Sequence, residues 1–226
     1  MKAKLIEHFE QFVLPQRVAL LNKNLSFRTR YLTAVVEDIF QQHNASAIVR
    51  TCDCFGIQDL HIIESRNKFL PNKEIALGSE FWVDIHKYTS QDNTSEAIQH
   101  LKNEGYRIVA TTLHEKAVPL EKFDLNAGKT AFIFGTELTG ISDAAKNMAD
   151  EFLTIPMFGF ADSFNVSVSA AIVMHFLTLQ LRQSNLAWQL TEEEKMDVKI
   201  KWLKNSIKKP ELLEKHFIEN YRSSPQ

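Results

Sequence analysis

The residues best suited to chemistry lie in one stretch in the second half of the chain, from Ile155 to Val168. There an apolar run passes through a polar loop containing Ser163 and Asn165, and continues into a small, apolar run that starts at Val166. Serine and asparagine are common helix-capping residues, and uncapped amides at a helix start can donate hydrogen bonds to a polar ligand. The stretch therefore indicates either a ligand-binding turn or a capped core helix.

Two earlier segments have a similar character. The run FIFGTELTGIS passes from an apolar, strand-like part into an acidic loop that contains Gly135 and Glu137, and then into an expected helix. The run HNASAIVRTCDCFG places Asn44 at an expected helix start and Arg50 about two turns later. The chain thus has three places where polar side chains lie at the border of an apolar element.

Hydrophobic periodicity predicts the elements that position these segments. We expect strands at 32–36, 60–63, 81–88, 107–113, 131–134 and 152–157, and helices at 44–55, 95–103, 142–148 and 166–182. This alternation favours an α/β fold with a parallel sheet and helices on both faces. Ligands of open sheets bind beyond the carboxyl ends of strands, where Thr111, Gly135 and Ile155 are expected to lie.

The two ends of the chain are different in composition. Residues 1–25 are typical of amphipathic helices interrupted near Pro15, and residues 186–217 of charged helical pieces with a break at Pro210. We therefore predict three parts: an N-terminal helical extension at 1–30, a sheet domain at 31–182 and a C-terminal helical extension at 183–226.

Composition limits the possible functions. The 226 residues carry a formal charge of -2, which argues against a uniformly basic nucleic-acid-binding surface, so such binding needs local patches. The candidate cations are Arg17, Arg28, Arg30, Lys201, Lys204 and Lys208, of which the three lysines are expected to share one helix face. The alternative for these lysines is an ordinary solvated helix face.

Other classes of protein are disfavoured by the sequence. No apolar run approaches the length that crosses a bilayer, and the N-terminus has no signal-like segment, so we expect a soluble, cytoplasmic protein without membrane contacts. The two cysteines, Cys52 and Cys54, lie two positions apart on an expected helix and so face different sides, which disfavours a disulfide. None of the eight histidines has metal-ligand spacing, so no metal site is expected.

Taken in order, the segments around Asn44, Gly135 and Asn165 closely resemble the three motifs of the SpoU branch of the SPOUT RNA ribose methyltransferases. The resemblance covers roughly residues 30–182, and weaker similarity at both ends points to the group that modifies guanosine in the tRNA D-loop. It implies a SPOUT-type parallel sheet whose C-terminal part forms a deep trefoil knot. It also implies that S-adenosylmethionine binds in the knot, and that a homodimer has its active site at the subunit interface.

The resemblance also implies roles for single residues. The family's motif positions match catalytic candidates Asn44, Arg50, Glu137, Ser163 and Asn165. Methyl-donor contacts, largely from backbone, are implied for Thr111, Gly135, Ile155 and Phe164. Phe164 departs from the leucine usual in relatives, so we expect an altered pocket shape with binding retained.

The residue types suit methyl transfer to a ribose. A 2′-hydroxyl is a poor nucleophile at neutral pH, so attack on a sulfonium methyl group needs a positioned base and a nearby positive charge. Arg50 can supply that charge and hold an RNA phosphate, but a guanidinium stays protonated far above neutral pH. The identity of the base therefore stays open.

The sequence leaves more than one function to be weighed. The first prediction is methylation of a tRNA ribose, with guanosine 18 as the preferred target. The alternatives are methylation of ribosomal RNA or of another tRNA position, and, from a different class, a non-catalytic RNA-binding module. A dinucleotide-binding oxidoreductase is disfavoured, since no G-x-G-x-x-G follows the first strand.

Overall fold

The computed structural model describes residues 1–70, 72–113, 116–136 and 139–223. The chain divides into two compact units, which we call the sheet domain, residues 29–188, and the helical unit, residues 1–28 with 189–226. Among the helices that the structure describes, none has the length and hydrophobicity to span a membrane.

The described residues of the sheet domain form a seven-stranded, fully parallel sheet. The strands are β1 (Leu32–Glu37), β2 (Asp59–Ile63), β3 (Asp84–Tyr88), β4 (Arg107–Thr111), β5 (Val118–Pro119), β6 (Thr130–Phe134) and β7 (Glu151–Thr154). Their order is β3-β2-β1-β6-β4-β7-β5, so β6 lies between β1 and β4 although it comes later in the chain. The expected parallel α/β fold is confirmed.

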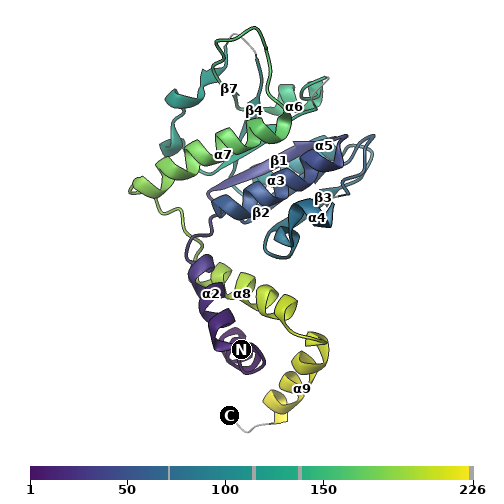
Figure 1. Cartoon of the computed structure of the whole chain (residues 1–226), viewed down its shortest axis with the longest axis vertical. Helices are drawn as coiled ribbons and strands as arrows, with labels where there is room; N and C mark the ends of the chain where they lie inside the picture. The colour runs from purple at the N-terminus through teal and green to yellow at the C-terminus, as the bar shows by residue number, and fades with distance from the viewer. Residues whose placement is uncertain (71, 114–115, 137–138, 224–226) are drawn as a thin grey trace. The chain divides into compact units, whose positions relative to one another are not determined.

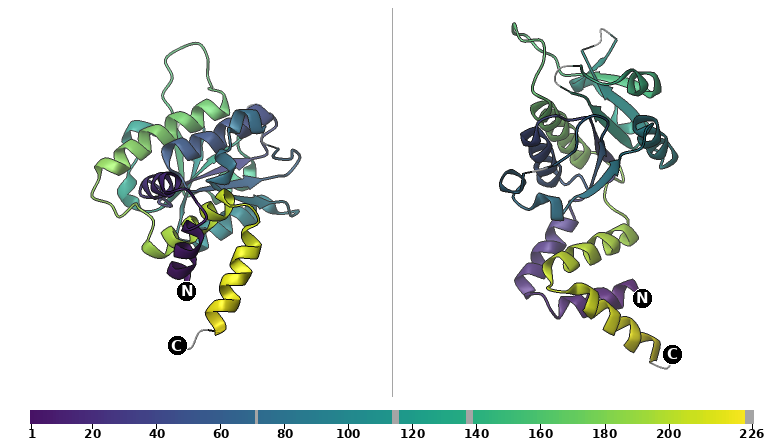
Figure 2. Two further views of the ribbon diagram at one scale, coloured as in Figure 1. Left: turned by 60° about the horizontal axis from the view of Figure 1, so that its bottom comes forward. Right: turned by 90° about the vertical axis from the view of Figure 1, so that its right-hand side faces the viewer.

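Helices cover both faces of this sheet (Figures 1 and 2). The helices are α3 (Gln42–Phe55), α4 (Lys73–Ala76), α5 (Asn93–Asn103), α6 (Asp143–Met148) and α7 (Val166–Gln183), with short 3₁₀ turns at Ser79–Phe81, Leu120–Lys122 and Leu125–Ala127. α3 and α7 pack side by side on one face, whereas α5 and α6 pack on the other. The larger core thus lies under α3 and α7.

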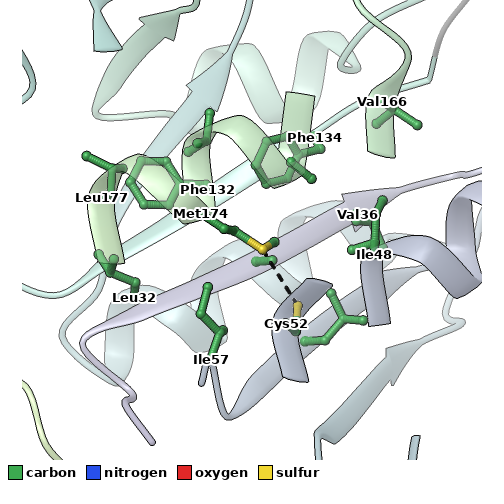
Figure 3. Close-up of a cluster of buried hydrophobic side chains, with 14 of the residues drawn as sticks. Leu32, Val36, Ile48, Cys52, Ile57, Phe132, Phe134, Val166, Met174 and Leu177 are labelled. Atoms are coloured by element: carbon green, nitrogen blue, oxygen red, sulfur yellow. Dashed lines mark hydrogen bonds between the residues drawn. The ribbon is translucent and has the colours of Figure 1, made fainter. Parts of the chain in front are cut away.

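Figure 3 shows the centre of this core. Cys52 of α3 contacts Met174 of α7 at 3.9 Å between the sulfur atoms, and Phe132 and Phe134 of β6 belong to the same buried cluster. Every residue of β6 is buried, as expected for a strand covered on both faces. Cys52 and Cys54 are both free thiols, as predicted. This packing fixes α7 against the sheet, and α7 begins at the predicted ligand-binding turn.

Several predicted element boundaries are wrong. The strand expected from residue 81 begins at Asp84, because the preceding residues form a 3₁₀ turn and a bend. The strands expected to reach residues 113 and 157 end at Thr111 and Thr154. α3 begins at Gln42, so Asn44 is inside the helix rather than at its start. The two-residue strand β5 was not predicted, since so short a run leaves no periodicity to detect.

The helical unit contains α1 (Lys2–Glu10), α2 (Pro15–Leu25), α8 (Glu192–Ser206) and α9 (Pro210–Ser223). Both prolines lie in the first turn of a helix, where the missing N–H is harmless, so the predicted breaks are confirmed. The two ends of the chain pack together: Lys2 pairs with Asp197 at 2.6 Å, and Lys199 with Glu10 at 2.7 Å. What the sequence predicted as two extensions is one helical unit.

Candidate active site

A cavity of about 120 Å³ opens at the carboxyl ends of β4, β6 and β7. Its walls are mainly apolar, with five side-chain hydroxyls among them. The lining residues are Thr111, Thr112, Leu113, Phe134, Gly135, Thr136, Gly140, Leu153, Ile155, Met157, Ser163, Phe164, Val166, Ser169 and Val173. All four residues implied as methyl-donor contacts are in this set, and so is Ser163. The structure therefore brings the second and third segments together around one cavity.

Backbone pairing gives one wall of the cavity its shape. The N–H and C=O groups of Thr136 and Gly140 exchange two hydrogen bonds of 3.0 Å across the β6–α6 connection. A Cβ atom at Gly135 would overlap the backbone of Gly140 and Ile141. Gly140 itself has φ of 67°, in the left-handed region that favours glycine. The close approach of this wall to the strand end thus depends on Gly135 having no side chain.

The start of α7 carries a polar cluster beside the cavity. Asn165 is the N-cap residue, because its Oδ1 accepts hydrogen bonds from the backbone N–H groups of Ser167 at 2.9 Å and Val168 at 3.4 Å. Of the two capping types in this stretch, Ser163 and Asn165, it is Asn165 that caps the helix. Its Nδ2 donates to Oδ1 of Asn44 at 3.0 Å. The first and third segments are therefore joined by a side-chain hydrogen bond between two residues 121 positions apart.

Ser167 is a member of this cluster that the sequence did not reveal. Its hydroxyl is 2.6 Å from Oδ1 of Asn165 and 3.3 Å from Oδ1 of Asn44. Asn44 is 4% exposed, so its amide depends on such partners in place of water. A serine two residues after an asparagine cap is an ordinary sequence feature, and only the packing of α3 against α7 gives it this contact. Ser167 thus helps to fix the orientation of both asparagines.

Arg50 lies apart from both features. It is exposed on α3, does not line the cavity, and pairs with no carboxylate that the structure describes. It lies six positions after Asn44, so the two side chains leave the helix about 120° apart. Glu137, the remaining catalytic candidate, lies outside the described residues. Within one chain, the cationic candidate and the cavity are separate.

Two of the cations predicted to bind RNA, Arg28 and Arg30, contact protein side chains instead. Arg28 is 4% exposed, and its guanidinium stacks over the ring of Trp202 at 4.9 Å. Arg30 is ion-paired with Asp59 at 2.7 Å and with Asp84 at 3.0 Å. A buried or doubly paired guanidinium is a poor partner for phosphate, so the structure does not support these two assignments. Counting charges along the sequence does not reveal such tertiary partners.

The predicted lysine face is also altered. α8 ends at Ser206, so Lys208 lies beyond the helix and the prediction that it shares a face with the other two lysines is wrong. Lys204 pairs with Glu214 of α9 at 2.7 Å. Lys201 and Lys208 are exposed, and Arg17 is partly exposed on α2. These three residues keep side chains at the surface of the helical unit.

Known proteins resemble this chain over most of its length. Residues 31–175 match the model of a family described as the SpoU rRNA Methylase family. The tRNA (guanosine(18)-2'-O)-methyltransferase of Borreliella burgdorferi is 42% identical over 211 residues, which cover 93% of this chain and 95% of that protein.

Solved structures agree with the observed fold. The TrmH/SpoU tRNA modifying enzyme of Aquifex aeolicus has a TM-score of 0.76 and 33% identity, over 86% of this chain and 98% of that one. The SpoU methyltransferase AviRb of Streptomyces viridochromogenes, in complex with the cofactor AdoMet, has a TM-score of 0.60 over 72% of this chain and 65% of that one. At 21% identity, the second likeness concerns the fold alone.

Proposed function

Since the chain belongs to the SpoU rRNA Methylase family, we propose that it transfers the methyl group of S-adenosylmethionine to the ribose 2′-hydroxyl of guanosine 18 in tRNA, in the cytoplasm. The observation that carries this proposal is the cavity at the ends of β4, β6 and β7, which is lined by the residues that the family resemblance implies for the methyl donor. Relatives that are 42% and 34% identical to this chain are named for this position in tRNA, which favours it over ribosomal RNA.

The cavity residues suit the proposed donor. Leu153, Ile155 and Phe164 offer apolar surface for a purine ring, while Thr111 and Ser163 offer hydroxyls for a ribose or an amino-acid group. When bound, S-adenosylmethionine supplies an electrophilic methyl group. The protein residues hold the donor and exclude water from it. A ribose hydroxyl positioned at the rim of the cavity is then the favoured acceptor of the methyl group.

On the RNA side, we assign the positive charge to Arg50. Its exposed guanidinium is free to hold a phosphate beside the target ribose and to stabilise the negative charge that develops on the attacking oxygen. Ser163, at the cavity, and the Asn44–Asn165 pair are the polar groups proposed to orient the 2′-hydroxyl. A guanidinium is protonated at neutral pH, so we do not assign Arg50 as the general base.

A second copy of the chain is the proposed partner that brings Arg50 to a cavity. The outer face of α7 carries Val168 and Leu179, which are 43% and 47% exposed, with Ile172 and His175 on the same face of the helix. An exposed apolar stripe of this kind is typical of a subunit interface. We therefore propose a homodimer with the active site between subunits. We also propose the trefoil knot, which the family resemblance implies.

The helical unit is the proposed second contact with tRNA. Lys208 and Lys201 are exposed on it, and Arg17 contributes a further cation. Phosphate contacts of this kind position the RNA without reading its sequence. A non-catalytic RNA-binding module remains the alternative from another class, but retention of Asn44, Arg50 and Asn165 and a formed cavity favour the enzyme.

The direct experiment uses the purified protein, S-adenosylmethionine and two tRNA transcripts, one carrying guanosine and one carrying adenosine at position 18. Mass spectrometry of nuclease fragments is expected to find one 2′-O-methylguanosine, at position 18 of the first transcript alone. Methylation at another position, or of ribosomal RNA in place of tRNA, would contradict the proposed target. No methylation of any RNA would favour the binding module.

Arg50→Ala tests the proposed chemistry. We expect turnover to fall by about 100-fold to 1,000-fold, because a charge that stabilises the developing oxyanion is lost, while donor affinity stays within about twofold. Cys54→Ser, one turn further along α3 and also exposed, is the matched control and should leave turnover unchanged. Equal losses in both variants would mean that this side of α3 acts only through assembly of the dimer.

A further inference from the structure

Glu37 ends β1 and has a buried carboxylate, and it lies outside the three segments around Asn44, Gly135 and Asn165. The residue is 4% exposed. Its Oε2 accepts the backbone N–H of Ser142 at 2.8 Å, and its Oε1 accepts the hydroxyls of Ser142 at 2.7 Å and Thr94 at 2.7 Å. A buried carboxylate is costly unless its oxygens are hydrogen-bonded, and two of these three donors belong to one residue, Ser142.

Ser142 is the point where the β6–α6 connection ends. It is the N-cap of α6, and its hydroxyl oxygen accepts the backbone N–H of Ala145 at 3.1 Å. The same connection contributes Gly135, Thr136 and Gly140 to the cavity. One end of the connection continues β6 in the centre of the sheet, and the other end is held by Ser142 on Glu37.

We propose that Glu37 is a positioning residue for the methyl-donor cavity. By holding the backbone N–H and the hydroxyl of Ser142, it keeps the β6–α6 connection against the end of β1 and so keeps the cavity wall in its binding geometry. The third hydrogen bond, from Thr94 at the start of α5, ties α5 to the same carboxylate but does not reach the cavity wall. The proposal rests on the proposed function, since it takes the cavity to be the donor site.

The three hydrogen bonds provide matched variants. Glu37→Gln replaces one acceptor oxygen with an N–H₂ group that faces donors. Ser142→Ala removes one of the two bonds between Glu37 and the connection, together with the N-cap bond to Ala145. Thr94→Val removes a hydrogen bond of the same length to the same carboxylate, yet leaves Ser142 in place. A purely structural carboxylate would respond to the loss of Thr94 much as to the loss of the Ser142 hydroxyl.

Donor binding is measured by calorimetric titration of the full chain with S-adenosylmethionine. We expect the affinity to fall by about tenfold in Glu37→Gln and several-fold in Ser142→Ala, consistent with losing hydrogen bonds to a charged group. Thr94→Val should stay within about twofold of wild type. In steady-state assays the KM for the donor should rise while kcat at saturating donor and the affinity for tRNA stay unchanged. Equal effects of Thr94→Val and Ser142→Ala on donor affinity would overturn the proposal.

Hydrogen exchange separates failure of this inference from failure of the proposed function. In the protein without donor, Glu37→Gln should speed exchange of the Ser142 and Gly140 amides, whereas Thr94→Val should not. Unchanged exchange at these amides would overturn the positioning role whatever the cavity binds. If exchange changes as expected but wild type binds no S-adenosylmethionine, the assignment of the cavity to a methyl donor fails, and with it the proposed role in donor binding.

Discussion

The two edges of the parallel sheet use their polar side chains differently. At the amino edge, where strands begin, charged groups pair with one another: Arg30 precedes β1 and binds both Asp59 and Asp84, the first residues of β2 and β3. At the carboxyl edge, carboxylates also bind the connecting loops: Glu37 accepts hydrogen bonds from Ser142, and Asp38 accepts the backbone N–H groups of Arg66 and Asn67 in addition to its ion pair with Arg66. The comparison suggests that the amino edge stabilises the framework, while the carboxyl edge fixes the connections that line the cavity.

The amino edge forms a closed set of partners. Asp59 accepts the Nε2 of His86 at 2.8 Å as well as Arg30. Burial alone would raise the pKa of Asp59, but the hydrogen bond with His86 and the charge of Arg30 outweigh burial and hold that pKa below its usual value. Further along the edge, Arg107 pairs with Glu151 at 2.8 Å, joining the first residues of β4 and β7. These charged side chains pair with one another, so they have little role in binding a ligand.

Gly135→Ala is the strongest way to break the carboxyl edge. A methyl group there overlaps the backbone of Gly140 and Ile141, so the cavity wall must move away from the strand end. We expect affinity for S-adenosylmethionine to fall by more than about 100-fold, since misplacing a binding wall by about 1 Å has effects of that size. Gly159→Ala is the matched control, because a Cβ atom at Gly159 meets no neighbour within 4 Å. The affinity of this variant for S-adenosylmethionine should be unchanged. Calorimetric titration compares the two alanine variants.

Arg30→Met is the corresponding change at the amino edge. It leaves Asp59 and Asp84 without their shared cation, and we expect the free energy of unfolding to fall by about 3 kcal/mol, as for other broken ion pairs with little exposure. Affinity for the donor should be unchanged in the folded protein. Arg66→Met, which removes an ion pair with Asp38 whose arginine is 78% exposed, should cost less than about 1 kcal/mol. Denaturant unfolding measures all three proteins, and a loss of donor affinity in Arg30→Met would end the distinction between the edges.

The sequence predicted the carboxyl edge better than the amino edge. Alternating apolar runs placed Thr111, Gly135 and Ile155 at strand ends, and all three line the cavity. This worked because strand ends in a parallel sheet meet at one edge whatever the strand order. The same reasoning could not give the roles of Arg28 and Arg30, since their partners are distant in sequence.

The hydrogen-bonded cluster of Asn44, Asn165 and Ser167 shows that long-range partners are equally hard to predict inside the candidate site. The capping role of Asn165 is local, so its residue type and its position before an apolar helix were enough to make it a capping candidate beside Ser163. Its bond to Asn44 and the part played by Ser167 depend on how α3 packs against α7, which periodicity does not specify. Periodicity likewise does not specify the partners of Glu37, which lie at the starts of α5 and α6.

We expect the stability of the sheet domain to depend on pH through a buried histidine of β2. His61 of β2 is buried, stacks on His86 at 4.6 Å and lies 3.0 Å from the hydroxyl of Tyr88. Burial first, and then the neighbouring charge of His86, lower its pKa to about 3, although Asp59 nearby acts in the opposite direction. The charged or titratable groups that face it are His86, Asp59, His100 and Tyr88.

Because the folded pKa of His61 lies below the unfolded value, the unfolded chain binds more protons as the pH falls below about 6.5. The contribution of His61 is therefore complete above that pH and is lost towards pH 3. Between pH 7 and pH 5 we expect the unfolding free energy to fall by about 2 kcal/mol from this residue. His61→Phe should remove that part of the pH dependence while donor affinity at pH 5 stays equal to wild type. An altered donor affinity would mean that the half of the sheet around β2 and β3 is coupled to the cavity.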